Sequence, residues 1–551
     1  MSKIKRWQPC ISAFLVTTLV LLSACSDRSG TDREAVSVPR NAVVVDVVAN
    51  TSLTAWLTEA VTQFNRDNLK TGSGKTVFVK TTFAEAGQTI ADHAAQSDFA
   101  SVWIPDNDAW VSLMGTRGNT NFSADCVSVA QSPLVIAMWR PLAESLGWPT
   151  RKLGWLDVSS LAADEAAWRY YSGGQYGRTL RLAHAHPSLS GSGASTLLAV
   201  MQAAKQSSVP LTTEEIKSPL VQASLNAFEG GVAVFGTSPN QLAQNMRARG
   251  IQYLGATVMY ENNVSEISSG DPEIVPVYPF EGTFMATHPA CINSISANEP
   301  REGAKLFREF LLKPEMQMLA QQHALRPATG SAKLNAPMDA AQPKIIFQAP
   351  SAEAIQTLQS TWQRARKPMH LVLVMDTSGS MTGSKITGLK AAAKKFVEQM
   401  NENDYLTLLP FNRLPRTVLA FERVGDSRTV ALQDIDALEA SGGTALYDAI
   451  AEASTNIASS TSKQRSNLIV VLTDGLDTNS TLKYGPTLIQ QATDNETSLY
   501  TIAYGDDADS KTLSDLATQS NGSFYKGNEA DIGAIYQEMS TAFGGNVGIG
   551  R

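Results

Sequence analysis

The sequence is poor in cysteine, has no excess of positive charge, and lacks a long apolar run after its first residues. It has 4 cysteines in 551 residues, and its 45 lysines and arginines against 52 aspartates and glutamates give a net charge of −7. The absence of a basic stripe argues against a nucleic-acid partner. No later segment approaches the roughly 20 apolar residues that a membrane-spanning helix needs. The chain also has no internal repeat and no long low-complexity tract.

The amino-acid composition is typical of a globular protein. Hydrophobic residues make up 43% of the chain and charged residues 18%, which argues against global disorder. The length is enough for three or four domain-sized units, each with its own core.

The first residues have the pattern of an export signal. Lys3, Lys5 and Arg6 precede a short apolar run from Ile11 to Leu22, which is too short to be a good membrane span. The run ends in Leu22-Ser23-Ala24-Cys25, which resembles a bacterial lipobox. The alternative is an ordinary secretory signal that happens to contain a cysteine.

The lipobox resemblance implies that residues 1–24 are removed and that Cys25 carries a lipid, which would anchor the chain to a membrane. Charged and polar residues 25–40 predict a flexible tether. Ser26 resembles the outer-membrane sorting pattern if the cell is Gram-negative. The predicted location is therefore the envelope of a bacterial cell, outside the cytoplasm.

Two cysteines remain after such processing. Cys10 would leave with the signal and Cys25 would be lipidated, so Cys126 and Cys291 are left. In an oxidising compartment they can form one disulfide. Two buried thiols are the alternative.

The C-terminal part alternates strand and helix patterns. Ile386–Met400 has the apolar spacing of a helix. Short apolar runs predict strands buried on both faces of a parallel sheet at Leu371–Met375, Leu406–Phe411, Leu468–Leu472 and Leu499–Ala503. This alternation predicts a doubly wound, Rossmann-like α/β domain at residues 368–551, with ligands at the carboxyl ends of its strands.

Five oxygen-bearing side chains are predicted to gather at that edge. Asp376, Ser378 and Ser380 form a D-x-S-x-S pattern after the first strand, Thr444 follows a glycine-rich turn, and Asp474 ends a buried strand. Mg²⁺ takes oxygen ligands in an octahedron and keeps some of its waters. The sequence therefore predicts a Mg²⁺ site, which Mn²⁺ or Ca²⁺ could also occupy. A helix cap or turn is the alternative for D-x-S-x-S alone.

The region from about Pro368 to Arg551 resembles the von Willebrand factor type A domain, and these five residues match its metal-ion-dependent adhesion site. The resemblance implies that the three hydroxyls coordinate the ion and that the two aspartates act mainly through bound waters. It also implies that a partner protein offers a carboxylate to the ion. A purely structural ion is the alternative.

The N-terminal part has a longer, mixed α/β pattern. Val43–Val48 predicts a strand and Ser52–Asn65 an amphipathic helix. Further strands are predicted at Val77–Thr82, Leu134–Met138, Val232–Phe235 and Thr283–Ala286. Residues 331–367 are predicted to be a linker, with a possible connecting helix at Ser351–Arg366.

Residues 41–330 resemble a type 2 periplasmic solute-binding domain. The resemblance rests on four segments, Phe99–Trp110, Leu182–Leu198, Tyr253–Asn263 and Tyr278–Ile292. It implies two lobes joined by a hinge, with a cleft that closes on a small solute.

Polar residues at predicted strand-to-helix turns are candidates for that cleft. There hydroxyls and free backbone N–H groups can bind an anion or another polar group. Helix caps and turns explain the same residues equally well. Asp106 and Glu261 would discourage an anion if they face the cleft. The candidate ligand-binding residues are Thr51, Ser52, Trp103, Ser192, Ser195, Thr237, Ser238 and Tyr260.

Three further patterns resemble functional motifs but do not predict a nucleotide, zinc or hydrolase site. Residues 71–76 are similar to a nucleotide-binding loop, but the predicted strand follows them instead of preceding them, so they predict a turn. His184 and His186 have no further ligand at zinc spacing. Ser192 lacks the G-x-S-x-G context of a hydrolase. The sequence does not predict an enzyme.

These patterns together predict a non-catalytic envelope lipoprotein that binds a protein partner through Mg²⁺ and a small solute in its cleft, for adhesion, sensing or assembly. Two alternatives stay open. One is the substrate-binding receptor of an ABC transporter, which a tight small-molecule ligand would favour. The other is a surface adhesion factor with a vestigial cleft.

Overall fold

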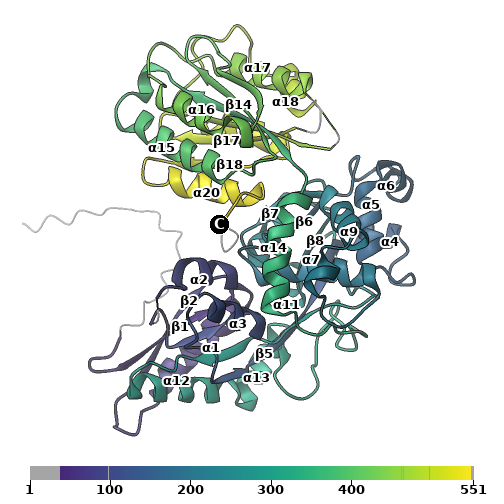
Figure 1. Cartoon of the computed structure of the whole chain (residues 1–551), viewed down its shortest axis with the longest axis vertical. Coiled ribbons are helices and arrows are strands. Elements are labelled where there is room, and N and C mark those ends of the chain that lie inside the picture. The colour runs from purple at the N-terminus through teal and green to yellow at the C-terminus, as the bar shows by residue number, and fades with distance from the viewer. Residues whose placement is uncertain (1–37, 97, 461, 463, 495–496, 548–551) are drawn as a thin grey trace, which may run out of the picture. The chain divides into compact units, whose positions relative to one another are not determined.

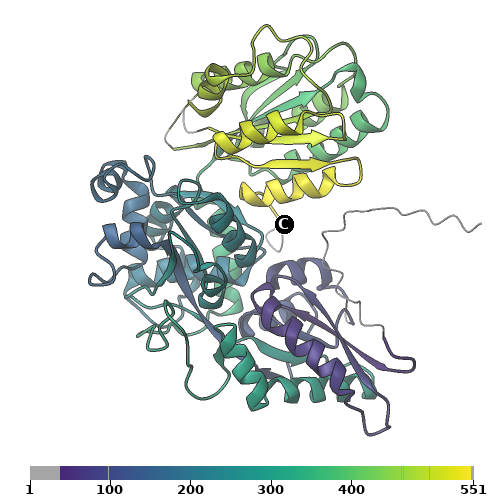
Figure 2. The same ribbon diagram turned by 180° about the vertical axis from the view of Figure 1, so that it is seen from behind.

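The computed structural model describes residues 38–547 except 97, 461, 463, 495 and 496. The predicted signal and Cys25 lie outside the described residues. Three β-sheets organise the described residues, which Figures 1 and 2 show from opposite sides. Among the helices of the described part, none combines the length and the apolar character that crossing a membrane requires.

The first lobe is built on a five-stranded sheet of order β2-β1-β3-β11-β4. The strands are β1 (Val43–Ala49), β2 (Val77–Phe83), β3 (Val102–Ile104), β4 (Cys126–Ser128) and β11 (Pro289–Ile292). The helices are η1 (Thr51–Leu53), α1 (Thr54–Asp67), α2 (Ala86–His93), α3 (Asp108–Thr116), α12 (Asn298–Leu311) and α13 (Pro314–Gln322). Alternate residues of β1, Val45 and Val47, pack with α1 and α12 in one core, because successive strand side chains point to opposite faces.

The second lobe is built on the sheet β10-β5-β8-β6-β7, with β9 and β12 also paired to β5. The strands are β5 (Ala130–Trp139), β6 (Leu182–Ala185), β7 (Val232–Gly236), β8 (Ala256–Tyr260), β9 (Ile274–Val277), β10 (Met285–Ala286) and β12 (Arg326–Pro327). The helices are α4 (Arg140–Ser145), α5 (Trp155–Ala163), α6 (Glu165–Ser172), α7 (Gly191–Lys205), α8 (Thr213–Ile216), α9 (Pro219–Gly230), α10 (Pro239–Arg249) and α11 (Glu261–Ile267). The chain enters this lobe from β4 to β5, returns to the first lobe from β10 to β11, and crosses again from α13 to β12.

The predicted connecting helix is α14 (Ala352–Ala365). It is amphipathic, and its buried residues Ile355, Leu358 and Trp362 belong to the main hydrophobic cluster of the solute-binding-like part. Trp362 also lies edge-on to His186 at 4.7 Å between ring centroids. The helix is thus a packed element and not a free spacer.

The C-terminal sheet has the order β15-β14-β13-β16-β17-β18, and all neighbours except β14 and β15 are parallel. The strands are β13 (Met369–Asp376), β14 (Tyr405–Phe411), β15 (Leu419–Arg423), β16 (Ser466–Thr473), β17 (Ser498–Tyr504) and β18 (Phe524–Gly527). The helices are η2 (Gly379–Met381), α15 (Ser384–Gln399), α16 (Val424–Asp436), α17 (Leu446–Ser459), α18 (Pro486–Thr493), α19 (Ser510–Gln519) and α20 (Ile532–Ala542).

Helices cover both faces of this sheet. Leu371 and Leu373 of β13 pack with α15, α16 and α20, whereas Val372 and Val374 pack with α17, α18 and α19. The central strands are therefore buried on both faces at almost every position, which explains the apolar runs in the sequence. The two-lobed α/β architecture and the doubly wound α/β domain are both confirmed.

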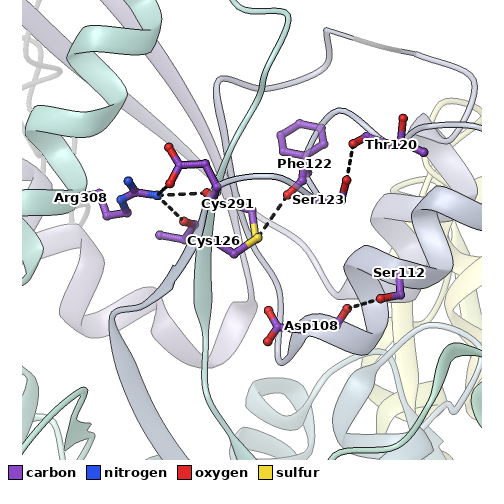
Figure 3. The surroundings of a disulfide bond; sticks show 10 residues. Asp108, Ser112, Thr120, Phe122, Ser123, Cys126, Cys291 and Arg308 are labelled. Atoms are coloured by element: carbon purple, nitrogen blue, oxygen red, sulfur yellow. Dashed lines mark hydrogen bonds and ion pairs between the residues drawn. A yellow bond between two sulfur atoms is a disulfide. The ribbon is translucent and has the colours of Figure 1, made fainter.

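A disulfide joins the two remaining cysteines in the first lobe (Figure 3). Cys126 of β4 and Cys291 of β11 face each other in antiparallel register, with their sulfurs bonded and their Cα atoms 4.0 Å apart. Beside it, the Arg308 guanidinium donates to the Asp125 carboxylate at 2.7 Å. The Asp108 carboxylate lies within 4.8 Å of both sulfurs, but sulfurs bonded to each other offer no thiolate to a metal.

Candidate functional site

The five predicted metal ligands lie at the carboxyl edge of the C-terminal sheet. Asp376 is the last residue of β13, and Asp474 directly follows the adjacent parallel strand β16. Thr444 lies two residues before α17. Ligands of doubly wound sheets gather at such strand ends.

Short hydrogen bonds connect three of these side chains. The Ser378 and Ser380 hydroxyl oxygens lie 3.0 Å apart, and Ser380 donates to Asp474 Oδ1 at 2.7 Å. Ser378, Asp376 and Asp474 are almost fully buried, whereas Ser380 lies at the surface. The three side chains thus lie together at the strand edge, where Ser380 is exposed to solvent.

Thr444 approaches these side chains beside Gly475. A Cβ atom added to Gly475 would lie 3.8 Å from the Thr444 hydroxyl oxygen and 3.9 Å from that of Ser380, so both hydroxyls flank Gly475. The carbonyl of Gly442 accepts the Gly379 N–H at 3.0 Å. Gly442 has a φ of +83°, a left-handed conformation that glycine adopts without a steric cost.

Both oxygens of Asp376 are already engaged by the protein. Oδ1 accepts the Ser378 N–H at 2.8 Å, and Oδ2 accepts the Thr473 hydroxyl at 2.6 Å. Burial raises the pKa of Asp376, the bonds from Thr473 and Ser378 oppose that rise, and the nearby charge of Asp474 adds to it. A cation at this edge would favour the ionised carboxylate.

A lysine that the sequence analysis did not single out completes the surroundings. Lys385 Nζ lies 2.6 Å from Asp474 Oδ2. Burial disfavours the ammonium, but the hydrogen bond and charge of Asp474 and the charges of Asp507 and Glu529 outweigh it and raise the pKa of Lys385. The sequence could have indicated Lys385 only through its position near the start of the helix that follows the D-x-S-x-S loop.

The donor set fits a hard cation such as Mg²⁺. Three hydroxyls and two carboxylates provide only oxygen, which is what Mg²⁺ and Ca²⁺ bind in proteins. Since Asp376 is fully engaged and Asp474 is shared between Ser380 and Lys385, the hydroxyls of Ser378, Ser380 and Thr444 are the groups most free to bind an ion directly.

A second polar cluster lies between the two N-terminal lobes. In the first lobe, Asn50 follows β1, Glu85 follows β2 and Asp106 follows β3. In the second lobe, Ser190 precedes α7 and Tyr260 ends β8. Strand ends of both sheets therefore meet here, as the resemblance to a solute-binding domain predicts.

Hydrogen bonds cross from one lobe to the other at this cluster. The Ser190 hydroxyl donates to Glu85 Oε2, and the Tyr260 hydroxyl donates to Asp106 Oδ1. Within the first lobe, Thr51 donates to Glu85 Oε1 and Asn50 to Asp106 Oδ2 at 3.1 Å. All four carboxylate oxygens thus have a protein donor.

The lobes approach closely at this point. A Cβ atom on Gly191, the first residue of α7, would lie 2.3 Å from the Asp106 carboxylate. Glycine is required there because any larger residue would collide with the carboxylate. The Asp106 carboxylate therefore lies beside the N-terminus of a 15-residue helix, a position that favours negative charge.

Burial dominates the electrostatics of this pair. It raises the pKa of Glu85 to about 8, with the charge of Asp106 as the second cause. Burial also raises the pKa of Asp106 to about 6, against the opposing bonds from Tyr260 and Asn50. At neutral pH the protonated form of Glu85 and the ionised form of Asp106 are therefore favoured, so the pair carries one negative charge.

Residues 45–326, about half of the chain, match the family model of the bacterial extracellular solute-binding proteins. The chain belongs to this family. In this solute-binding protein, residues 370–538 match the von Willebrand factor type A domain. These two domains support a binding or adhesion role.

Curated relatives match about a third of this chain. An uncharacterized protein of Synechocystis is 29% identical over 193 residues, covering 33% of this chain and 43% of its own length. The inter-alpha-trypsin inhibitor heavy chain H6 of Homo sapiens is 28% identical over 200 residues, covering 32% of this chain and 15% of its own length. The matched part of this chain thus spans less than half the length of these relatives.

Among solved structures, the ferric binding protein from Campylobacter jejuni has a TM-score of 0.42 and 11% identity over 58% of this chain and 99% of its own. A von Willebrand factor type A protein from Catenulispora acidiphila has a TM-score of 0.29 and 23% identity, over 32% of this chain and 42% of its own.

The predicted cleft residues of the solute-binding protein lie in different surroundings. Thr51 and Tyr260 belong to the interlobe cluster, and the Ser192 hydroxyl lies 2.9 Å from that of Ser190. Buried Ser52 donates to Asn50 at 2.6 Å. Buried Ser195 lies further along α7.

The other predicted cleft residues lie outside this cluster. Trp103 packs edge-on against Phe99 and Phe122 in the core. Ser238 caps α10 by accepting the Gln241 N–H, and Thr237 donates to the same glutamine side chain at 3.0 Å.

The two acidic residues flagged in the sequence behave differently. Asp106 faces the interlobe cluster, whereas Glu261 pairs with Arg326 at 2.9 Å and accepts the Tyr278 hydroxyl. Glu85 and Asn50 were missed, although each follows a predicted strand at the same kind of turn as Thr51.

Proposed function

We propose that this protein binds a partner protein through a Mg²⁺ ion held by Asp376, Ser378, Ser380, Thr444 and Asp474, and that it is not an enzyme. The observation that carries the proposal is the convergence of these oxygens at one strand edge. A carboxylate of the partner would complete the coordination of the ion.

The charge balance supports exchange of an outside carboxylate. Both oxygens of Asp376 are engaged, and Lys385 offsets the charge of Asp474. An ion bound mainly by neutral hydroxyls and water keeps most of its positive charge. It would therefore attract a carboxylate more strongly than an ion surrounded by anionic ligands.

Titration calorimetry of Mg²⁺ into the metal-stripped full-length protein tests the site. We expect saturable binding by the wild type and binding weaker by about 100-fold or more in Asp376→Ala, Ser378→Ala, because two groups that shape a hard-cation site are lost. Thr387→Ala, which removes an exposed hydroxyl on α15, is the matched control and should bind like the wild type. Mn²⁺ and Ca²⁺ are titrated in parallel. Equal heats from the wild type and the double variant would reject the metal site.

A second proposal concerns the interlobe cluster, where we infer that the protein takes a small solute. Two buried carboxylates from one lobe face hydroxyls from the other, which favours a cationic or neutral solute over an anion. An anion would have to approach a pair that already carries a buried negative charge at neutral pH.

Thermal unfolding with added small molecules tests this proposal. We expect a diamine such as putrescine to raise the melting temperature of the full-length protein by a few degrees, because a ligand that binds only the folded state stabilises it. Sulfate should leave it unchanged. Stabilisation by sulfate would contradict the inferred charge preference. The absence of any effect, with Mg²⁺ binding intact, would favour an adhesion factor with a vestigial cleft over a transport receptor.

Attachment to the envelope through a lipid on Cys25 is part of the same proposal. Its support is the sequence pattern around Cys25 together with membership of an extracellular family.

A further inference from the structure

Lys385 is placed beside the proposed metal site by the architecture of the domain. It is the second residue of α15, whose first residue, Ser384, donates to Glu529 at 2.9 Å. A Cβ atom on Gly505, directly after β17, would lie 3.8 Å from Lys385 Nζ. The ammonium group therefore lies over the strand end next to β16, where Asp474 is located.

The contact between Lys385 and Asp474 is close and shielded from water. Nζ and Oδ2 lie 2.6 Å apart, the Asp474 side chain is fully buried, and that of Lys385 is 24% exposed. The other oxygen of Asp474 accepts the Ser380 hydroxyl at 2.7 Å. A charge-assisted bond of this kind holds a carboxylate firmly in one orientation.

We propose that Lys385 is a positioning residue that holds Asp474 away from direct contact with the ion, a role that rests on the proposed Mg²⁺ site. The ammonium neutralises the carboxylate that would otherwise bind the ion most strongly. It also adds a positive charge close to a divalent cation, which weakens the binding of that cation. The consequence is a weaker but more electrophilic Mg²⁺ site, suited to a carboxylate from outside.

Removing the charge of Lys385 tests this role, and Mg²⁺ titration of the full-length protein is the measurement. Lys385→Met is expected to bind Mg²⁺ about ten-fold more tightly than the wild type, because one nearby positive charge is lost and Asp474 is released toward the ion. Lys385→Arg keeps the charge and should stay within about two-fold of the wild type.

The matched control is Lys394→Met. Lys394 lies on the same helix and pairs with Asp436 at 2.6 Å, away from the five predicted ligands. Its loss removes the same charge and an ion pair from the same helix, although this pair is more exposed, so an unchanged Mg²⁺ affinity there isolates the local effect of Lys385.

A double-mutant cycle with Asp474→Asn separates positioning from a general charge effect. If Lys385 acts through Asp474, Lys385→Met should tighten Mg²⁺ binding clearly less in the Asp474→Asn background than in the wild type. A merely structural lysine would change the melting temperature without Mg²⁺ and leave the affinity unaltered. If Lys385→Met does not fold, Lys385→Gln replaces it in the same comparison.

The outcomes are distinguishable from failure of the metal site. No Mg²⁺ binding by the wild type overturns the proposed site and this role with it. Normal binding by the wild type with unchanged or weaker binding by Lys385→Met overturns the role of Lys385 alone.

Discussion

Replacing Arg366 by methionine is expected to destabilise the C-terminal domain by about 3–5 kcal/mol, because it leaves a buried carboxylate without its cation. The Arg366 guanidinium lies 2.6 Å from Asp404 Oδ2, and the two side chains are 2% and 0% exposed. The same carboxylate accepts the backbone N–H groups of Met369 at 3.1 Å and Asn401 at 3.0 Å. These bonds hold the carboxylate in place, so it cannot escape to water when Arg366 is lost.

Urea unfolding of the full-length protein, followed by far-ultraviolet circular dichroism, measures this effect. Arg364→Met is the matched control, because Arg364 is an exposed residue of α14 two positions earlier, and its loss should change the free energy of unfolding by less than about 0.5 kcal/mol. Arg366→Met combined with Asp404→Leu should cost less than Arg366→Met alone, since no unpaired charge remains. Equal effects of the Arg366 and Arg364 substitutions would contradict the ion-pair argument.

The strands of the C-terminal domain show where sequence patterns succeed. The run Leu371–Met375 predicted β13, which spans Met369–Asp376, and the other three buried strands were found equally well. Helices on both faces bury almost every position of such a strand, so its sequence is a run of mainly apolar residues. The edge strands β15 and β18 were missed because half of their side chains or more are not buried.

The sequence pattern could not predict which elements pack against each other. The amphipathic helix at Ser351–Arg366 was predicted almost to its ends, yet its apolar stripe does not say which surface it covers. In the structure that stripe joins the core of the solute-binding domain. A stripe of apolar residues indicates burial but not its partner.

Residues of the two sites also differ in whether the sequence could identify them. The predicted metal ligands were identifiable because D-x-S-x-S and the strand ends are local signals. Lys385 and Glu85 were not, because their importance comes from contacts that exist only after folding. In a sequence, a glutamate after a strand is indistinguishable from a solvated turn residue.

Replacing Glu85 by glutamine is expected to change how the stability of the N-terminal lobes depends on pH. Burial raises the pKa of Glu85 from 4.5 to about 8, so the folded protein holds a proton that the unfolded chain has released between these values. The contribution of Glu85 to stability should therefore be fully present below about pH 4.5 and be lost as pH rises through 8. The full shift corresponds to roughly 3–5 kcal/mol.

Glutamine keeps the shape of the side chain but carries no charge at any pH. It can still accept the Thr51 hydroxyl through its carbonyl oxygen, and its amide can donate to the Ser190 oxygen. It also removes the repulsion of Asp106. Urea unfolding at pH 5 and at pH 8.5 should therefore show nearly equal stability of the two proteins at the lower pH and a more stable variant at the higher pH. Glu309→Gln, at an exposed position on α12, should follow the wild type at both. Parallel curves for the wild type and Glu85→Gln would mean that the buried carboxylates are not protonated as their contacts indicate.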